Sequence, residues 1–189
     1  MIDFTQEITK YCDTLKTTID ATPKEDINQV LNILLQAYEQ RQQVFVMGNG
    51  GSAATASHLA CDFNEGIAAG KTKQFRVIAL TDNIPSITAI ANDMGYEMIF
   101  VQQLSSLMEP GDYVIGISGS GNSENVIRAI DYANEHGAIT IGVTGYSGGR
   151  LKQKAQYNIH INVDDMQVAE DLHMVLNHIV MRVLKKHLM

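Results

Sequence analysis

Apolar residues in the amino-terminal part of the chain recur every three or four positions, which is the spacing of amphipathic helices. A first stripe predicts a helix and consists of Phe4, Ile8, Tyr11, Leu15 and Ile19. The run Thr22-Pro23-Lys24-Glu25 matches a capping box with proline at the first helical position, so a second helix is expected there. Its apolar stripe is Ile27, Val30, Leu31, Leu34 and Tyr38. Residues 1–41 thus form a two-helix lead-in, which either covers a sheet face or packs against another subunit.

From residue 43 short apolar runs alternate with helical stretches. The apolar runs predict five strands, at residues 44–47, 76–80, 114–117, 138–143 and 157–163. Helices are expected to begin after residues 52 and 124, and further helices are expected at 84–91 and 100–107. A turn is expected at 92–96 and a closing helix at 166–188. This alternation predicts an α/β fold with a doubly wound, five-stranded parallel sheet flanked by helices. No linker or low-complexity segment is found, so residues 1–189 are interpreted as one domain.

The third strand leads into a loop of glycines and hydroxyl residues, Ser118-Gly119-Ser120-Gly121-Asn122-Ser123, before a helical pattern begins at Glu124. Glycines let backbone N–H groups converge, and the first turn of the helix adds its own free N–H groups. Three hydroxyls without a lysine suit a phosphomonoester. The P-loop and G-x-G-x-x-G patterns are absent, so no nucleotide cofactor is expected. The alternative is a polar turn in which Ser123 only caps the helix.

A second loop of the same design follows the first strand, with the sequence Gly48-Asn49-Gly50-Gly51-Ser52. In a parallel sheet, ligands bind beyond the carboxyl ends of the strands. Two such loops can therefore hold the two ends of one ligand, a phosphate and a sugar. A third glycine-rich turn, at residues 145–149, is interpreted as structural.

Titratable side chains recur on two of the predicted helices. His58 and Asp62 are four residues apart and point from one helix face. Glu170, His173 and His178 share a broad face of the closing helix, at about 100° per residue. This helix is otherwise apolar almost all round, so we expect it to be buried, in part at a subunit interface. His58, Asp62, Glu170 and His178 can form a tetrahedral zinc site or act as general acid and base on a sugar, and a buried hydrogen-bond network is the alternative.

Composition narrows the class of protein. The chain has 189 residues, of which 45% are hydrophobic, and a formal net charge of −7. This charge, without a basic run or helix, argues against nucleic acid and anionic membranes as partners. Cys12 and Cys61 form no C-x-x-C motif. With neither a signal peptide nor a run of roughly 20 apolar residues, a cytoplasmic protein is expected.

Three motifs carry a resemblance to a known family: Gly48-Asn49-Gly50-Gly51-Ser52-Ala53-Ala54, Ala91-Asn92-Asp93-Met94-Gly95-Tyr96 and Ile117-Ser118-Gly119-Ser120-Gly121-Asn122-Ser123. They resemble the SIS (sugar isomerase) domain family, and within it the phosphoheptose isomerase branch, in the same order over nearly the whole chain. The resemblance implies a flavodoxin-like architecture and a homotetramer with active sites at subunit interfaces. It also implies conversion of sedoheptulose 7-phosphate to D-glycero-D-manno-heptose 7-phosphate, in the synthesis of bacterial surface heptose.

The resemblance also implies roles for individual residues. Ser52, Ser118, Ser120 and Ser123 match phosphate-binding and sugar-binding serines, and Asn49 and Asp93 match residues that line the sugar site. With the neighbouring loop residues, the predicted substrate site is Asn49, Gly50, Gly51, Ser52, Asp93, Ser118, Gly119, Ser120, Asn122 and Ser123. His58 and His178 match the two family histidines. The second is the proposed acid, and some members bind zinc through both.

Four positions depart from the family pattern. Asp62 stands where the family usually has the glutamate that is its proposed base, and Glu170 stands in place of glutamine. An arginine is replaced by Gly66, and a threonine by Gly119. We therefore expect His178, Asp62 and Glu170 to be catalytic, with either carboxylate as the base, and His58, Asp62, Glu170 and His178 to be the zinc ligands. The alternatives are an isomerase of another ketose phosphate and a non-catalytic phosphosugar sensor or assembly partner.

Overall fold

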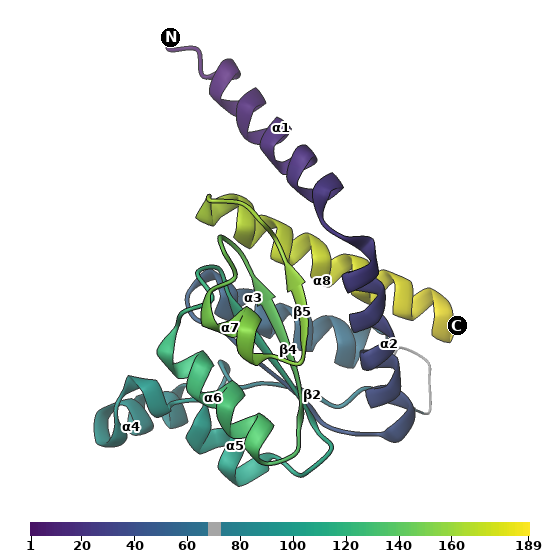
Figure 1. The fold of residues 1–189 in the computed structure, drawn as a ribbon, viewed down its shortest axis with the longest axis vertical. Helices are drawn as coiled ribbons and strands as arrows, with labels where there is room; N and C mark the ends of the chain where they lie inside the picture. Colours follow the sequence, from purple (N-terminus) through teal and green to yellow (C-terminus); the bar gives the residue numbers. More distant parts are fainter. Residues whose placement is uncertain (68–72) are drawn as a thin grey trace.

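A single five-stranded parallel sheet forms the centre of the computed structural model, which describes residues 1–67 and 73–189 (Figure 1). The strands lie in the order β2-β1-β3-β4-β5. They comprise β1 Val44–Met47, β2 Val77–Ala79, β3 Tyr113–Ser118, β4 Ile139–Thr144 and β5 Tyr157–His160. The predicted fold class is confirmed, and β1 spans the predicted residues.

Helices cover both faces of the sheet, because alternate residues of each strand face opposite sides. Val44 and Val46 of β1 pack with one set of helices, and Phe45 and Met47 pack with the other. The first face carries α2 Lys24–Gln40, α3 Gly51–Cys61, the π-helix η1 Asp62–Ile67 and α8 Met166–Leu188. The second face carries α4 Ile84–Met94, the 3₁₀ helix η2 Tyr96–Met98, α5 Val101–Leu107, α6 Glu124–Glu135 and α7 Gly149–Lys154.

Helix α1, Thr5–Ala21, extends away from the body of the molecule, with the amino terminus at its free end (Figure 1). Among the described residues, no α1 side chain is buried, and Phe4 and Ile8 are 59% and 62% exposed. The Tyr11 hydroxyl donates a hydrogen bond of 2.7 Å to the Asp171 carboxylate on α8. This bond raises the pKa of Tyr11 to about 12. Of the two lead-in helices, α2 thus covers the sheet, whereas two of the five residues in the first apolar stripe, Phe4 and Ile8, face solvent.

The predicted capping box at residues 22–25 is wrong. Helix α2 begins at Lys24 with Pro23 at its N-cap, and no side-chain capping bond is found there in the described chain. The Thr22 hydroxyl instead donates to the Thr18 carbonyl, 2.9 Å away. Only Thr22 and Pro23 separate α1 from α2, so Thr22 is used to end the first helix. The predicted turn at 92–96 is also wrong in part, because α4 continues to Met94.

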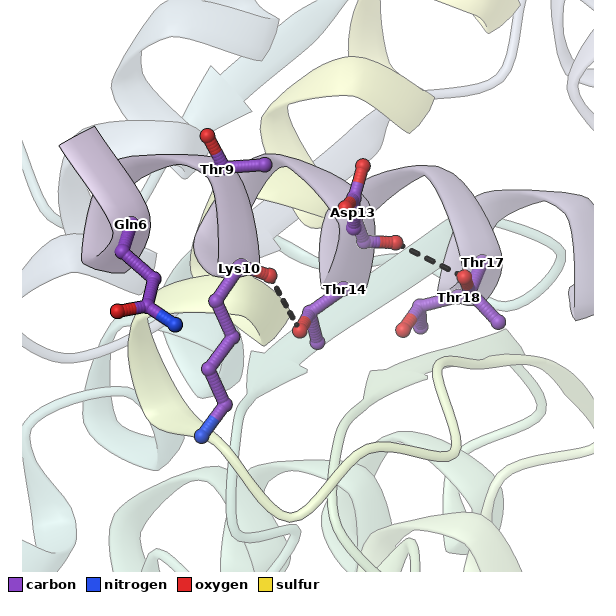
Figure 2. A pocket seen from close by; sticks show the side chains of 7 residues that line it. All are labelled: Gln6, Thr9, Lys10, Asp13, Thr14, Thr17 and Thr18. Carbon is purple, nitrogen blue, oxygen red and sulfur yellow. Dashed lines mark hydrogen bonds between the residues drawn. The ribbon is translucent and has the colours of Figure 1, made fainter.

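An open groove of about 700 Å³ lies along the polar side of α1 (Figure 2). Its lining residues are Gln6, Thr9, Lys10, Asp13, Thr14, Thr17 and Thr18. The Thr14 and Thr17 hydroxyls donate to the Lys10 and Asp13 carbonyls of their own helix, at 2.9 and 2.8 Å (Figure 2). The threonines therefore satisfy the helix backbone, and we do not assign a ligand to this groove.

A helix that crosses a bilayer must be both long and apolar. Within residues 1–67 and 73–189, no helix meets both conditions.

Candidate active site

The two predicted ligand loops lie side by side at the carboxyl edge of the sheet. The loop at residues 48–52 follows β1 and the loop at 118–123 follows β3, and these strands are neighbours. The side-chain amides of Asn49 and Asn125 exchange two hydrogen bonds, each of 2.9 Å, between the first loop and the start of α6. The structure thus brings together two segments about seventy residues apart in sequence, as parallel pairing of their strands requires.

In the loop after β3, the serine hydroxyls face one another. Ser118 Oγ lies 3.1 Å from Ser123 Oγ and also accepts a hydrogen bond of 3.1 Å from the Gly121 N–H. Ser123 precedes α6, but its side chain makes no capping bond within the described residues. The alternative in which Ser123 only caps the helix therefore lacks its hydrogen bond. The hydroxyls and the α6 terminus remain a suitable anion site.

The third glycine-rich turn, at residues 145–149, lies against the loop at residues 118–123. The Gly145 N–H donates to the Gly119 carbonyl, and the Leu151 N–H donates to the Gly121 carbonyl, both over 2.9 Å. Gly121 has φ of +66°, and a Cβ at this position would clash with the Gly148 backbone. The close approach of the two loops thus requires glycine at 121. The structural interpretation of residues 145–149 agrees with these contacts.

A second polar cluster surrounds Asn49. The Tyr96 hydroxyl donates to Asn49 Oδ1 over 2.8 Å, alongside the bond from Asn125. A pocket of about 380 Å³ adjoins this cluster and Ser123, with Arg128 at its side. Sequence reasoning gave no role to Tyr96 or Asn125. The available signal was that Tyr96 closes a family motif and that Asn125 is a polar residue on the apolar face of α6.

The remaining loop residues differ in their accessibility. Gly50 and Gly51 are exposed at the start of α3, whereas Ser52 is 4% exposed and packs back against Gly48. Asp93 is exposed in the last turn of α4, where its carboxylate accepts a 2.7 Å hydrogen bond from Asn92. Asp93 is not among the residues that line the pocket beside Asn49 within the described chain.

His58, Asp62 and His178 converge on one point between α3 and α8. The two Nε2 atoms lie 3.0 Å apart. Asp62 Oδ2 lies 3.4 Å from the Nε2 of His58 and 3.8 Å from that of His178. The imidazoles are about half exposed, and the Asp62 side chain is 16% exposed. The group is therefore open to a ligand on the histidine side and enclosed on the carboxylate side.

These three side chains fit a metal ion. Among the described residues they form a group that could hold one, each offering one donor atom. Donors at zinc bond lengths of 2.0–2.2 Å in a tetrahedral arrangement lie about 3.3 Å apart. The observed separations of 3.0, 3.4 and 3.8 Å bracket this value. Three protein ligands leave a fourth position open, which is typical of catalytic zinc sites.

Glu170, the fourth predicted ligand, is not part of this group in the described chain. Its carboxylate lies against Gly51, where a Cβ would come within 2.6 Å of Glu170 Cδ. Eight residues of helix separate Glu170 from His178, which corresponds to about 12 Å. Within one chain, Glu170 therefore belongs to the glycine loop, and the two histidines meet about two helical turns away.

Asp62 stands at the point where α3 changes into the π-helix η1, and such insertions are frequent at functional sites. The Asn64 side chain anchors η1 to β2, donating to the Val77 carbonyl and accepting from the Val77 N–H at 2.7 and 3.0 Å. From α8, Asn177 Nδ2 donates to Asp62 Oδ2 over 2.9 Å. Sequence reasoning missed Asn177, although its signal was a polar residue four positions after His173 in an apolar helix.

His173 does not share the open face with Glu170 and His178, as the helical phase suggested. It is 2% exposed and lies against the sheet. Burial lowers the pKa of His173 to about 4, so the ring is neutral at neutral pH. It thus has no part in the histidine–aspartate group.

Comparison with known proteins agrees with the predicted family and the observed fold. The SIS domain family model matches residues 3–145. The chain is 36% identical over 182 residues to the phosphoheptose isomerase of Clostridium acetobutylicum, covering 92% of each chain. It is 40% identical over 156 residues to a probable phosphoheptose isomerase of Thermoplasma acidophilum, covering 82% of this chain and 85% of the other. The solved phosphoheptose isomerase of Neisseria gonorrhoeae superimposes with a TM-score of 0.89 at 27% identity, over 97% of this chain and 100% of that one. The chain belongs to the SIS domain family, in its phosphoheptose isomerase branch.

Proposed function

We propose that this protein is an aldose–ketose isomerase that converts sedoheptulose 7-phosphate to D-glycero-D-manno-heptose 7-phosphate. One observation carries the proposal: relatives named phosphoheptose isomerase share 36–40% identity over most of the chain. The geometry is consistent with this reaction. An anion loop with paired serines lies at the sheet edge, and two imidazoles and a carboxylate converge between α3 and α8.

We assign phosphate binding to the loop at residues 118–123 and to Ser52, and sugar binding to Asn49 and Asp93. The reacting carbons C1 and C2 are at the far end of the seven-carbon chain from the phosphate. The general base is one of the two carboxylates, Asp62 or Glu170. It takes a proton from C1 and returns one to C2 through an enediol. His178 moves the oxygen-bound protons, so that O2 gains a proton and O1 loses one.

Zinc is the proposed metal at the histidine–aspartate group, held by His58, Asp62 and His178. A bound zinc ion supplies Lewis-acid polarisation of a substrate oxygen. The chain's own contribution is to hold the three donors together: α3 presents His58, the start of η1 presents Asp62, and α8 presents His178.

We infer further that the protein is a homotetramer whose sites are completed across subunits. Two features support this inference: the outward apolar residues Phe4 and Ile8 on α1, and Val175 and Val183 on α8, which are 40% and 45% exposed. Glu170 also lies about 12 Å along α8 from His178. In such an assembly, Glu170 of one subunit serves the histidine–aspartate group of another. Cys12 and Cys61 are free and exposed, which is consistent with our assignment to the reducing cytoplasm.

The isomerase proposal is tested by NMR of sedoheptulose 7-phosphate in D₂O with the purified protein, with added zinc and with EDTA. Turnover with deuterium entering at C2 is expected, since the abstracted proton exchanges with solvent. Loss of turnover with EDTA, and its return with zinc, would support the metal assignment. Saturable binding without turnover would contradict sedoheptulose 7-phosphate as the substrate and favour an isomerase of another ketose phosphate or a phosphosugar sensor.

The phosphate site gives a second prediction. Ser123→Ala is expected to lower kcat/KM about 10–100-fold, mainly through KM, because a hydrogen bond to a charged group contributes roughly 1.5–3 kcal/mol. The matched control is Ser106→Ala on α5, whose hydroxyl donates a hydrogen bond to the Gln102 carbonyl of its own helix. Steady-state kinetics measures both variants. Equal KM values in Ser123→Ala and the control would show that Ser123 does not bind the phosphate.

A further inference from the structure

On its enclosed side, the Asp62 carboxylate is hydrogen-bonded to Asn177, a residue to which the family motifs give no role. Asn177 is 5% exposed, and its Nδ2 donates to the same carboxylate oxygen, Oδ2, that faces both histidines. A carboxylate only accepts hydrogen bonds, so the NH₂ side of the amide must face Asp62. The Asn177 carbonyl oxygen must then point elsewhere.

Among the described residues, that oxygen has no hydrogen-bond partner. Asn177 Oδ1 and both ring nitrogens of His173 are buried and have no hydrogen-bond partner among residues 1–67 and 73–189. The Thr144 backbone approaches the His173 ring, but without the geometry of a hydrogen bond. Leaving a buried polar atom unpaired is unfavourable, because it loses its hydrogen bonds to water on folding. These three unpaired atoms on two neighbouring side chains indicate that a small polar ligand binds between them.

A small cavity is lined by both His173 and Asn177. It has a volume of about 40 Å³ and lies between α8 and the sheet; its other lining residues are aliphatic except for Thr55. A cavity of roughly 15 Å³ already holds one water molecule when two or more polar partners are present. His173 and Asn177 are four residues apart on α8, so both present their side chains to the same space.

We propose that Asn177 is a positioning residue for Asp62, and that a buried water molecule between Asn177 and His173 fixes its amide. The water donates one hydrogen to Asn177 Oδ1 and the other to the unprotonated nitrogen of the neutral His173. The amide then cannot turn, and its NH₂ group holds Asp62 Oδ2 toward His58 and His178. Only the kinetic part of this inference rests on the proposed isomerase function.

The test compares the wild type with Asn177→Leu, which keeps the size of the side chain and removes the amide. The control is Leu184→Ala, two turns further along α8, because Leu184 is buried but is not among the described residues that line the cavity. It reports what destabilising α8 does by itself. Zinc dissociation constants are measured by competition with a chelating dye, and kcat and KM with sedoheptulose 7-phosphate.

Asn177→Leu is expected to weaken zinc binding and to lower kcat by about 10–100-fold, as for other residues that orient metal ligands. KM should change less than threefold, and Leu184→Ala should lower the melting temperature without changing the zinc dissociation constant. Crystal structures of the metal-free proteins should show the water in the wild type and a displaced Asp62 carboxylate in Asn177→Leu.

An unmoved Asp62 carboxylate in Asn177→Leu, with zinc binding within twofold of the wild type, would overturn the positioning role. A cavity without water density would overturn the water site. If the wild type does not isomerise the sugar phosphate, the proposed function fails by itself. The crystal structures still decide this inference, whether or not the protein binds zinc.

Discussion

Asp62→Asn is expected to lower kcat for sedoheptulose 7-phosphate by about 10²–10⁴-fold, the range typical of a positioned general base. The change removes the charge that faces His58 and His178 and keeps the shape of the side chain. The carbonyl oxygen of the introduced amide can still accept the hydrogen bond from Asn177, so the fold and the contact between η1 and α8 should persist. Steady-state kinetics measures the loss, and circular dichroism confirms that the variant is folded.

The matched control for this substitution is Glu65→Gln, three residues further along η1. Glu65 is exposed, and no ion pair of its carboxylate is found in the described part of the chain. Glu65→Gln removes the same negative charge from the same helix, at a residue outside the histidine–aspartate group. Activity of Asp62→Asn close to that of Glu65→Gln would exclude Asp62 both as base and as an essential zinc ligand.

The sheet and the location of both loops at its carboxyl edge could be predicted because they depend on local patterns, whereas the strand order that makes the loops neighbours could not. Buried strands appear as short apolar runs, and parallel pairing brings the ends of β1 and β3 to one edge. The closing helix was likewise predicted at its observed bounds, Met166–Leu188. A helix of this length with one apolar pattern has few alternative positions for its ends. Two of the three family motifs contain these loops.

The separation of Glu170 from His178 follows from their spacing in the sequence, but the prediction of a four-ligand site used only the helical angle and not the distance along the axis. Glu170 and His178 are close in angle, but the rise of eight residues separates them by about 12 Å. Helix α3 packs beside α8 so that Gly51 meets Glu170 and His58 meets His178. Which end meets which depends on tertiary packing. The same applies to His173, which was predicted to share a face with Glu170 and His178 but lies buried against the sheet.

Glu170 lies apart from the histidine–aspartate group that it was predicted to join. This separation leads to the second prediction with a large effect. Glu170→Ala is expected to lower kcat by about 10²–10⁴-fold, because the proposed site requires this carboxylate as base or ligand. Glu170→Gln keeps the size of the side chain but removes its charge and its ability to accept a proton, so a loss of the same order is expected. The neighbouring Asp171→Asn serves as control, because Asp171 bonds to Tyr11 on α1 instead.

Mixed oligomers then test whether Glu170 acts within its own subunit or in another. Asp62→Asn and Glu170→Ala chains are co-expressed with two different affinity tags, and oligomers that carry both tags are purified. If each site combines Asp62 of one subunit with Glu170 of another, random pairing leaves both residues intact in about a quarter of the sites. Activity near a quarter of the wild-type value is then expected, although each variant alone is nearly inactive. If both residues act within one subunit, every site carries one defect and mixing restores nothing. That outcome would contradict the shared site and require α8 and α3 to shift until Glu170 reaches the histidines of its own chain.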